Sequence, residues 1–226
     1  VQDWFYWKQD AWGSHEFDPA RFPDPEAWIR KIHDQYKARF MISVWPKFYP
    51  TTANYAELNE AGCMFNKNIE QGNIDWIYPG FLNGFYDAFG ADCRDIYWRQ
   101  LKEKINVHGF DAWWLDAVEP DIHSNLSFEH RKDLISPNAL GTGAEYFNAY
   151  ALPHAETVYV GEREVDGHQR SFILTRSGFG GIQRTGSAIW SGDVVSRWSN
   201  LEEQIAAGIG AGIAGMPYWT HDIGGF

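Results

Sequence analysis

The stretch GFDAWWLDAVEP, residues 109–120, decides the fold of this chain. Its apolar run from Phe110 to Leu115 is interrupted once, by Asp111, and stops at the carboxylate of Asp116. Such a run, preceded by a glycine and followed by a proline, is typical of a buried parallel strand. Catalytic groups usually lie at the C-terminal mouths of barrel strands, so Asp116 is a candidate catalytic residue. From this stretch alone, a structural role for Asp116 is favoured as much as a catalytic one. The aspartate could cap the next helix or pair with an arginine.

Further strands are expected on both sides of this central strand, which covers residues 110–116. Four of them lie at residues 1–7, 39–45, 170–175 and 186–190. The last strand and the loop after it lie within residues 215–226. Residues 47–91 are interpreted as loop and short helix, and residues 121–150 as a long excursion that is partly helical. The chain therefore has six expected strands.

Helices are expected between these strands, at residues 25–38, 92–107 and 200–213. The first has Asp24 as its N-cap and Pro25 as a favoured first helical residue. The last follows a capping box formed by Ser199 and Glu202.

Alternating strands and helices predict a parallel sheet of βαβ units. No glycine-rich phosphate loop follows a strand, which argues against a doubly wound nucleotide-binding sheet. An α/β fold of the (β/α)8 TIM type, here a partial barrel lacking two strands, fits better, because 226 residues suffice for most of one such barrel. The chain begins at Val1, inside an apolar stretch and without Met. We interpret residues 1–226 as a single domain excised from a longer protein.

Charge and composition exclude several classes of partner. The net charge is 19 − 30 = −11, which would repel a phosphate backbone or an anionic membrane surface. Two cysteines, Cys63 and Cys93, make neither a disulfide framework nor a zinc site, and their spacing does not decide whether they pair. The most apolar run, residues 205–216, carries four glycines and is too short to span a membrane. No signal peptide is present, and the compartment stays open.

Four of the expected strand mouths carry an acid: Asp3, Asp116, Asp193 and Asp222. In a barrel these mouths converge on one pocket. Two carboxylates flanking one bond can cleave a glycoside, because one attacks the anomeric carbon and the other protonates the leaving oxygen. Arg176, at another mouth, could hold a sugar hydroxyl or keep one carboxylate ionised.

Aromatic residues stand at the same mouths. Trp45, Trp114 and Trp190 could wall the pocket, since the flat faces of tryptophan stack on sugar rings. Each such aspartate, arginine or tryptophan alone is as often or more often structural, but their joint occurrence on one side favours a site. The eight histidines show no paired metal spacing and are interpreted as surface or loop residues, so no metal site is expected. No Gly-x-Ser-x-Gly elbow is present, which argues against acyl transfer.

Five motifs together resemble glycoside hydrolase family 31 over essentially the whole chain. They are FDPARFPDP at 17–25, WLDAVE at 114–119, LTRSGF at 174–179, WSGD at 190–193 and DIGGF at 222–226. The resemblance implies a (β/α)8 barrel from about its second to its seventh strand, and retaining hydrolysis of α-linked sugars in an oligosaccharide without a metal or cofactor. It makes Asp116 the nucleophile and Asp193 the acid/base.

The residues and the resemblance together give an expected substrate-binding set: Asp3, Phe5, Trp45, Trp114, Arg176, Trp190, Asp222 and Phe226. The WGSH loop at residues 12–15 and the long excursion at 121–170 resemble the α-xylosidase-type members. An α-glucosidase or transglucosylase on the same scaffold is the first alternative. A catalytically silent sugar-binding domain is the alternative of another class, and the presence of both candidate catalytic aspartates argues against it.

The resemblance also implies that the first and eighth barrel strands are absent, together with a histidine that the family uses in the sugar subsite. Flanking domains of a parent chain are therefore expected partners. We expect residues 1–226 alone to be poorly folded and inactive, because two open sheet edges would be left uncovered.

Overall fold

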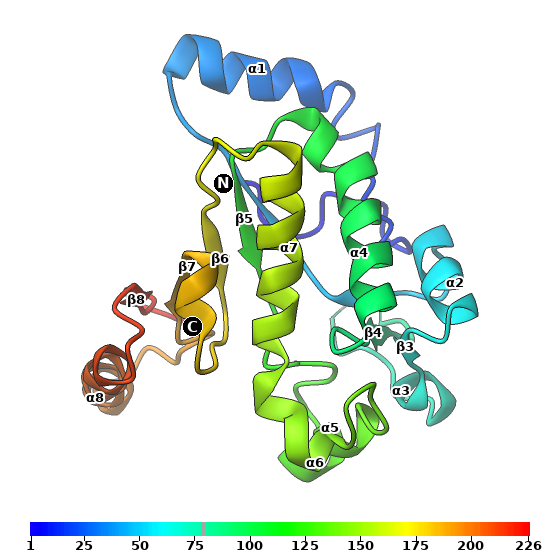
Figure 1. Cartoon of the computed structure of the whole chain (residues 1–226), viewed down its shortest axis with the longest axis vertical. Helices are drawn as coiled ribbons and strands as arrows, with labels where there is room; N and C mark the ends of the chain where they lie inside the picture. The colour runs from blue at the N-terminus through cyan, green and yellow to red at the C-terminus, as the bar shows by residue number, and fades with distance from the viewer. Residues whose placement is uncertain (78–79) are drawn as a thin grey trace.

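The computed structural model describes residues 1–77 and 80–226. Its centre is a parallel sheet of five named strands, which follow one another in chain order across the sheet (Figure 1). These strands are β1 (Met41–Val44), β5 (Ala112–Leu115), β6 (Ile173–Thr175), β7 (Ser187–Trp190) and β8 (Trp219–Thr220). Neighbours in sequence thus become neighbours in space, as a barrel wall requires.

The N-terminal segment adds a sixth position at the β1 edge. Gln2 forms a parallel bridge with Ile42, but residues 1–7 do not form the full strand expected from the sequence. Phe5 has a φ of 64°, in the left-handed region, so the backbone leaves the extended conformation there. The expected alternation that would place Asp3 and Phe5 on one face is therefore broken.

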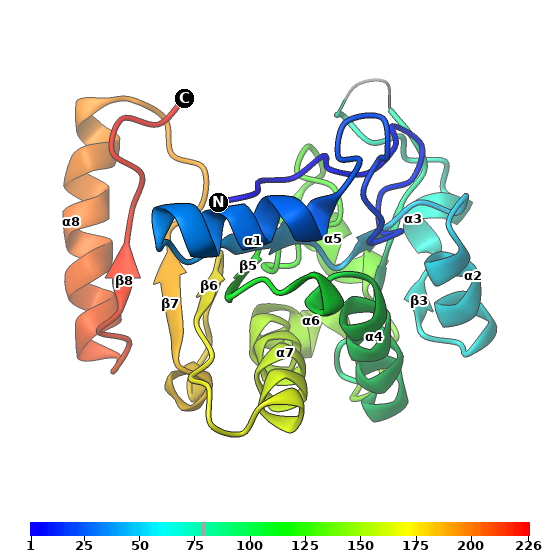
Figure 2. The same ribbon diagram turned by 90° about the horizontal axis from the view of Figure 1, so that it is seen from above.

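Helices cover the outer side of this sheet. They are α1 (Pro25–Tyr36), α4 (Ala91–Lys104), α7 (Ala151–Val165) and α8 (Trp198–Ile213). Helices α4 and α7 lie side by side, and α8 lies beyond β8 at the far end of the sheet (Figure 2). Asp24 caps α1 as expected, accepting a 2.8 Å hydrogen bond from the backbone N–H of Ala27.

One expectation about helices was wrong, and one helix lies where no element was assigned. Helix α8 begins at Trp198 after Arg197, without a side-chain cap, so Ser199 lies inside the helix and forms no capping box. Helix α7 lies in a segment to which no element was assigned from the sequence, and it contains Pro153 and Gly161. The proline lies in the first turn, where it is tolerated, and the glycine allows the Trp98 ring to approach the helix backbone.

Residues 47–90 form a small subdomain, although the sequence alone supported no strands there. Strands β2 (Lys47–Phe48), β4 (Gly84–Tyr86) and β3 (Met64–Phe65) make an antiparallel sheet in that order. Helices α2 (Ala53–Glu60) and α3 (Lys67–Glu70) complete it. The Cys63–Cys93 disulfide joins this subdomain to the first turn of α4 and settles the pairing that the spacing left open.

The excursion after β5 is partly helical, as expected. It contains α5 (Phe128–Leu134) and α6 (Gly143–Tyr146), followed by the 3-10 turn η2 (Phe147–Ala149) that leads into α7. Two further 3-10 turns, η1 (Asn106–His108) and η3 (Ile182–Thr185), precede β5 and β7. Gly109 ends η1 with a φ of 90°, a conformation that favours glycine.

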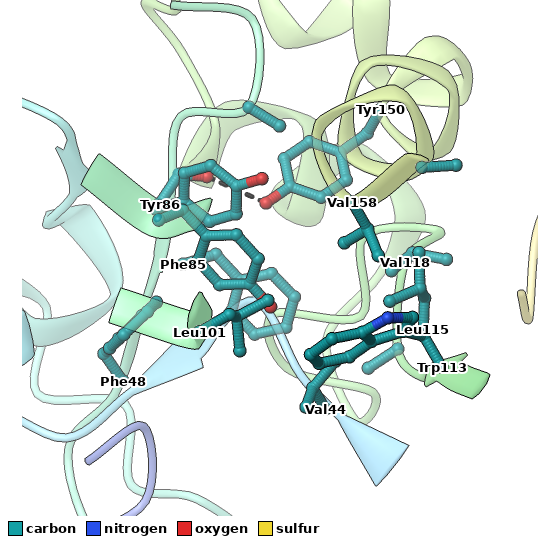
Figure 3. Packing of buried hydrophobic residues seen from close by; sticks show 14 of the residues in the cluster. Val44, Phe48, Phe85, Tyr86, Leu101, Trp113, Leu115, Val118, Tyr150 and Val158 are labelled. Carbon is teal, nitrogen blue, oxygen red and sulfur yellow. Dashed lines mark hydrogen bonds between the residues drawn. The ribbon is translucent and has the colours of Figure 1, made fainter. Parts of the chain in front are cut away.

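The core lies between the sheet, α4, α7 and the small subdomain, and it is rich in aromatic rings (Figure 3). Trp113 of β5 is fully buried against Trp98 of α4, with ring centroids 5.8 Å apart. Tyr150 donates a 2.8 Å hydrogen bond to the backbone carbonyl of Tyr86, which ties α7 to β4. Large buried rings therefore hold the excursions onto the barrel wall.

The interpretation of all histidines as surface or loop residues was wrong for His154 and right for His15, which lies in a loop although its side chain is buried. His154, on α7, is fully buried and its Nδ1 lies 2.8 Å from the Tyr86 hydroxyl. His15 is also buried. Burial lowers the pKa of each imidazole to about 3, so both are neutral at physiological pH.

Beyond β8 the apolar face of α8 is exposed, through Ile205, Ile209 and Ile213. An apolar helix face at an open sheet edge needs a further layer to cover it. That residues 1–226 form one domain that does not fold well alone stays a prediction. In the part of the chain that the structure describes, no helix is both long and apolar enough to cross a membrane.

Candidate active site

The C-terminal ends of the parallel strands surround a pocket of about 510 Å³. Seven of the expected site residues line it with Asp116 and Asp193: Asp3, Trp45, Trp114, Arg176, Trp190, Asp222 and Phe226. Phe5 does not line it. The turn at Phe5 aims its ring at the Arg21 guanidinium, which lies 4.6 Å from the ring centroid, and Trp4 lines the pocket instead. The expected mouths thus converge as a barrel requires.

Asp116 lies directly after β5 and is 6% exposed. Its backbone N–H donates to the carbonyl of Val44, at 3.1 Å, which continues the β1–β5 pairing up to this residue. Its Oδ1 accepts a 2.8 Å hydrogen bond from the N–H of Ala117. Ala117 has a φ of 60°, so the chain turns sharply away and leaves the carboxylate at the mouth of the strand.

Arg176 occupies the equivalent position after β6. Its N–H donates to the carbonyl of Leu115, at 3.1 Å, which fixes it beside the end of β5. Its guanidinium is buried and meets four carboxylates. Its Nη1 lies 3.1 Å from Asp116 and 3.6 Å from Asp193, its Nε 2.6 Å from Glu119, and its Nη2 3.0 Å from Asp121. One rigid, always charged group therefore fixes the acids in space.

Asp193 follows β7 and differs sharply from Asp116 in exposure. Its side chain is 62% exposed, whereas that of Asp116 is 9% exposed. The same nitrogen, Nη1 of Arg176, contacts Oδ1 of Asp116 and Oδ2 of Asp193. These two oxygens can be no farther apart than the 3.1 Å and 3.6 Å contacts placed end to end. The site thus pairs one buried and one accessible carboxylate on a common cation.

Burial and charge oppose each other at Asp116. Burial raises the pKa of its carboxyl to about 7, the Arg176 guanidinium and the Ala117 N–H lower it, and Glu119 and Asp193 raise it. Burial also raises the pKa of Glu119, while the charge and hydrogen bond of Arg176 lower it. Burial disfavours the charge on Arg176, but the surrounding carboxylates outweigh this effect and raise its pKa. Ionisation of Asp116 therefore depends on Arg176.

Tryptophan rings form the walls at the strand ends. The rings of Trp114 and Trp190 meet edge to face with centroids 5.6 Å apart. Trp45 also lies near Arg176, whose guanidinium is 5.7 Å from the centre of the Trp45 ring. These apolar faces close to the carboxylates could pack against the ring of a sugar.

Sequence reasoning missed the residues that the two excursions bring to the pocket. They are Lys47, Asp75, Trp76, Ile77, Asp121, Ile122, His123 and Ser124. The signals for Lys47 and Asp121 were local, since each follows an expected strand within a few residues. The approach of Trp76 and His123 depends on tertiary packing and has no local signal. In residues 1–77 and 80–226, no group of three or more His, Cys, Asp or Glu side chains is arranged to hold a metal ion.

Comparison with known proteins places the whole chain in one family. The sequence model described as "Glycosyl hydrolases family 31 TIM-barrel domain" matches residues 1–226. An α-xylosidase of Saccharolobus solfataricus is 37% identical over the whole chain, which covers 28% of that protein. An uncharacterised family 31 glucosidase of Pseudescherichia vulneris is 32% identical over the whole chain, which covers 40% of that protein.

Solved structures agree. The GH31 α-xylosidase from Xanthomonas citri superposes with a TM-score of 0.95 and is 55% identical, over 99% of this chain and 24% of that one. A GH31 α-xylosidase from a soil metagenome, complexed with xylose, has a TM-score of 0.83 and 33% identity over 99% of this chain and 31% of that one. The chain thus spans about a quarter to two fifths of these relatives.

The dependence on Arg176 can be tested by Arg176→Met in the full-length protein. Removing the cation leaves Asp116 and Glu119 buried without a counter-charge, so unfolding free energy should fall by about 3–5 kcal/mol. The pKa of Asp116 should rise above its value of about 7, because the lost cation favoured the ionised form. The stability deficit should therefore be smallest well below pH 7, where Asp116 is protonated in both native proteins, and should grow as the pH rises through about 7, where Asp116 ionises in the wild type but not in the variant.

Denaturant unfolding at several pH values, with NMR titration of the carboxyl carbons, measures both effects. Arg184→Met is the matched control, since Arg184 pairs with Glu156 on the surface and should contribute less than about 1 kcal/mol. Equal effects of the two substitutions, or an unchanged pKa of Asp116, would contradict this account.

Proposed function

Because the chain belongs to glycosyl hydrolase family 31, we propose that this pocket is the active site of a retaining α-glycoside hydrolase, with Asp116 as nucleophile and Asp193 as acid/base. The observation that carries the proposal is the shared contact of both carboxylates with Nη1 of Arg176. The proposal concerns the whole protein, of which this chain contributes part of the barrel. Flanking domains of the parent chain would complete the pocket.

The spacing of the carboxylates supports retention. Retaining enzymes hold the two groups roughly 5–5.5 Å apart, whereas inverting enzymes need roughly 6.5–9.5 Å to admit a water between them. The contacts of 3.1 Å and 3.6 Å to one nitrogen set an upper bound on the separation of the two contacting oxygens, which covers the retaining range and extends just into the inverting range. This bound is compatible with direct attack by Asp116 on the sugar.

The chemistry follows from the two environments. Asp116, ionised beside Arg176, attacks the anomeric carbon, and the bond to the leaving oxygen breaks. Asp193 gives its proton to that oxygen, and the glycosyl group remains as an ester on Asp116. Asp193 then removes a proton from a water molecule, which attacks the anomeric carbon, breaks the ester and regenerates the Asp116 carboxylate. Two displacements at one carbon leave the released sugar in the α configuration.

We propose xylose as the transferred sugar. The α-xylosidases of S. solfataricus and X. citri support this choice through identities of 37% and 55% over essentially the whole chain. An α-glucosidase of S. solfataricus is also similar, at 28% identity over 96% of this chain and 34% of that protein, so a glucosidase or transglucosylase is the second candidate. A sugar-binding domain without catalysis is disfavoured, because it would need neither carboxylate in this geometry.

The role of Asp116 can be tested by covalent trapping in the full-length enzyme. A 5-fluoro-xylosyl fluoride should label Asp116, because the ring fluorine slows both displacements while the good fluoride leaving group keeps the first one fast, so the ester accumulates. The labelling rate should fall as the pH drops through about 7, since protonated Asp116 cannot attack. Peptide mass mapping locates the sugar, and a label on any other residue would refute the assignment.

The role of Asp193 can be tested with substrates that differ in leaving group. Asp193→Ala should lower turnover of disaccharides about 10²–10⁴-fold and that of glycosyl fluorides far less, because fluoride leaves without a proton. With the fluoride, azide should raise turnover, because it attacks the Asp116 ester without needing a base, and should yield a glycosyl azide of retained configuration. Asp222→Ala, which changes another acid that lines the pocket, is the control and should show no azide rescue. Equal loss on both substrates would mean that Asp193 has a structural role.

A further inference from the structure

Trp76 stands at the rim of the pocket, and its side chain is unusually open for a tryptophan. The residue is 58% exposed, yet it lines the same pocket as Asp116 and Asp193. It comes from the loop between α3 and β4, far in sequence from both aspartates. A large apolar face left in water is costly unless something covers it, and an indole beside a sugar-cleaving pair is suited to stack on a ring.

The residue before Trp76 anchors this loop. Asp75 is buried, and its carboxylate forms an ion pair with Lys47, accepts a 3.1 Å hydrogen bond from the Tyr49 hydroxyl and accepts another, of 3.2 Å, from the Ile77 N–H. Its own N–H donates to the carbonyl of Phe81, at 2.8 Å, across the loop. The backbone that carries Trp76 is therefore held on both sides.

The excursion after β5 also contacts the loop that carries Trp76. Nε2 of His123, in the loop after β5, lies 2.9 Å from the backbone carbonyl of Ile74. Ile74 also forms an antiparallel bridge with Leu82. Both excursions that surround the pocket thus meet at the base of the Trp76 loop.

Lys47 connects this rim to the floor of the pocket. It is buried just after β1, with its Nζ 4.2 Å from the ring centre of Trp12 and 5.7 Å from that of Trp45. Trp45 in turn lies beside Arg176. A buried lysine held by one carboxylate and two indoles has little freedom, so the Lys47–Asp75 pair fixes the rim loop relative to the candidate catalytic groups.

The different exposures of the Asp116 and Asp193 carboxylates distinguish the inner end of the pocket from its outer side. The buried Asp116 marks the end where the transferred sugar would be held, and the exposed Asp193 marks the side from which the leaving oxygen departs. Trp76, more exposed still than Trp45, Trp114 or Trp190, belongs to this outer side. A ring stacked on it would therefore be the leaving group.

We propose that Trp76 is a specificity-determining residue whose indole stacks on the leaving sugar of an oligosaccharide, and that the Lys47–Asp75 pair is the positioning element that holds it there. This inference rests on the proposed function, because it needs a glycoside cleaved between Asp116 and Asp193. It predicts a preference for leaving groups that offer a pyranose face over small leaving groups.

The test compares two substrates in the full-length enzyme: α-xylosyl fluoride, which has no leaving sugar, and xylose α-1,6-linked to glucose. Trp76→Ala should lower kcat/KM for the disaccharide roughly three- to tenfold and leave that for the fluoride unchanged, since stacking acts only on the leaving ring. Trp76→Phe keeps a flat face and should retain most of the activity. Tyr36→Ala, which removes an exposed ring from α1 outside the pocket, should change neither value.

The positioning role has its own readout. It is the ratio of kcat/KM for the disaccharide to kcat/KM for the fluoride. Asp75→Asn should lower this ratio, and the double variant with Trp76→Ala should lower it no further than Trp76→Ala does, because Asp75 acts through Trp76. If Asp75→Asn lowers the thermal midpoint too far for assay, Tyr49→Phe removes one hydrogen bond from Asp75 and should change the ratio in the same direction.

The outcomes separate the two proposals. A wild-type enzyme that turns over neither substrate would overturn the proposed α-xylosidase activity. A wild-type enzyme active on both, with Trp76→Ala losing both equally or neither, would overturn the role of Trp76 alone. Additive effects of Asp75→Asn and Trp76→Ala on the ratio would overturn the positioning role of the Lys47–Asp75 pair.

Discussion

The guanidinium of Arg176 is the interaction on which the site depends. Four carboxylates that would otherwise repel one another converge on it, and only a planar group with several donors can contact all of them. Its place is set by the parallel pairing of β5 and β6, through the hydrogen bond from the Arg176 N–H to the Leu115 carbonyl. A shift of β6 by one residue in that register would turn Arg176 away from the pocket, while Asp116 kept its place after β5. The strand pairing of the barrel wall therefore positions Arg176, and Arg176 in turn positions the four carboxylates.

The sequence predicted the barrel wall well because strand signals are local. Short apolar runs located β1, β5, β6 and β7, and Asp116, Arg176 and Asp193 come just after the last three of those runs. Prediction from the sequence failed where packing between distant segments determines the structure more than the local residue pattern does. Helix α7 contains a glycine that its packing against Trp98 of α4 explains, and strands β2, β3 and β4 are two or three residues long and stable only as a sheet. Phe5 was assigned to the site by an alternation that its left-handed backbone breaks.

The same division explains the site residues. Those at strand ends were predictable, whereas those on the excursions were not. Lys47, Asp75 and Trp76 reach the pocket only because the small antiparallel sheet is fixed to the barrel, by buried rings and by the Cys63–Cys93 disulfide. An invariable inner site built on strands, with an outer rim built on inserted loops, is how one barrel can keep its chemistry while the loops select the substrate. In this protein the rim is tied to the inner site through Lys47 rather than left free.

The central claim is that one arginine holds two carboxylates close enough for direct attack on the sugar. The most direct test is the configuration of the first sugar released by the full-length enzyme from an aryl α-xyloside, followed by proton NMR in the first minutes of reaction. The account predicts that α-xylose appears first and the β anomer only later, by mutarotation. Initial appearance of β-xylose would mean a single displacement by water, and would contradict both the spacing that we infer and the role of Asp116 as nucleophile.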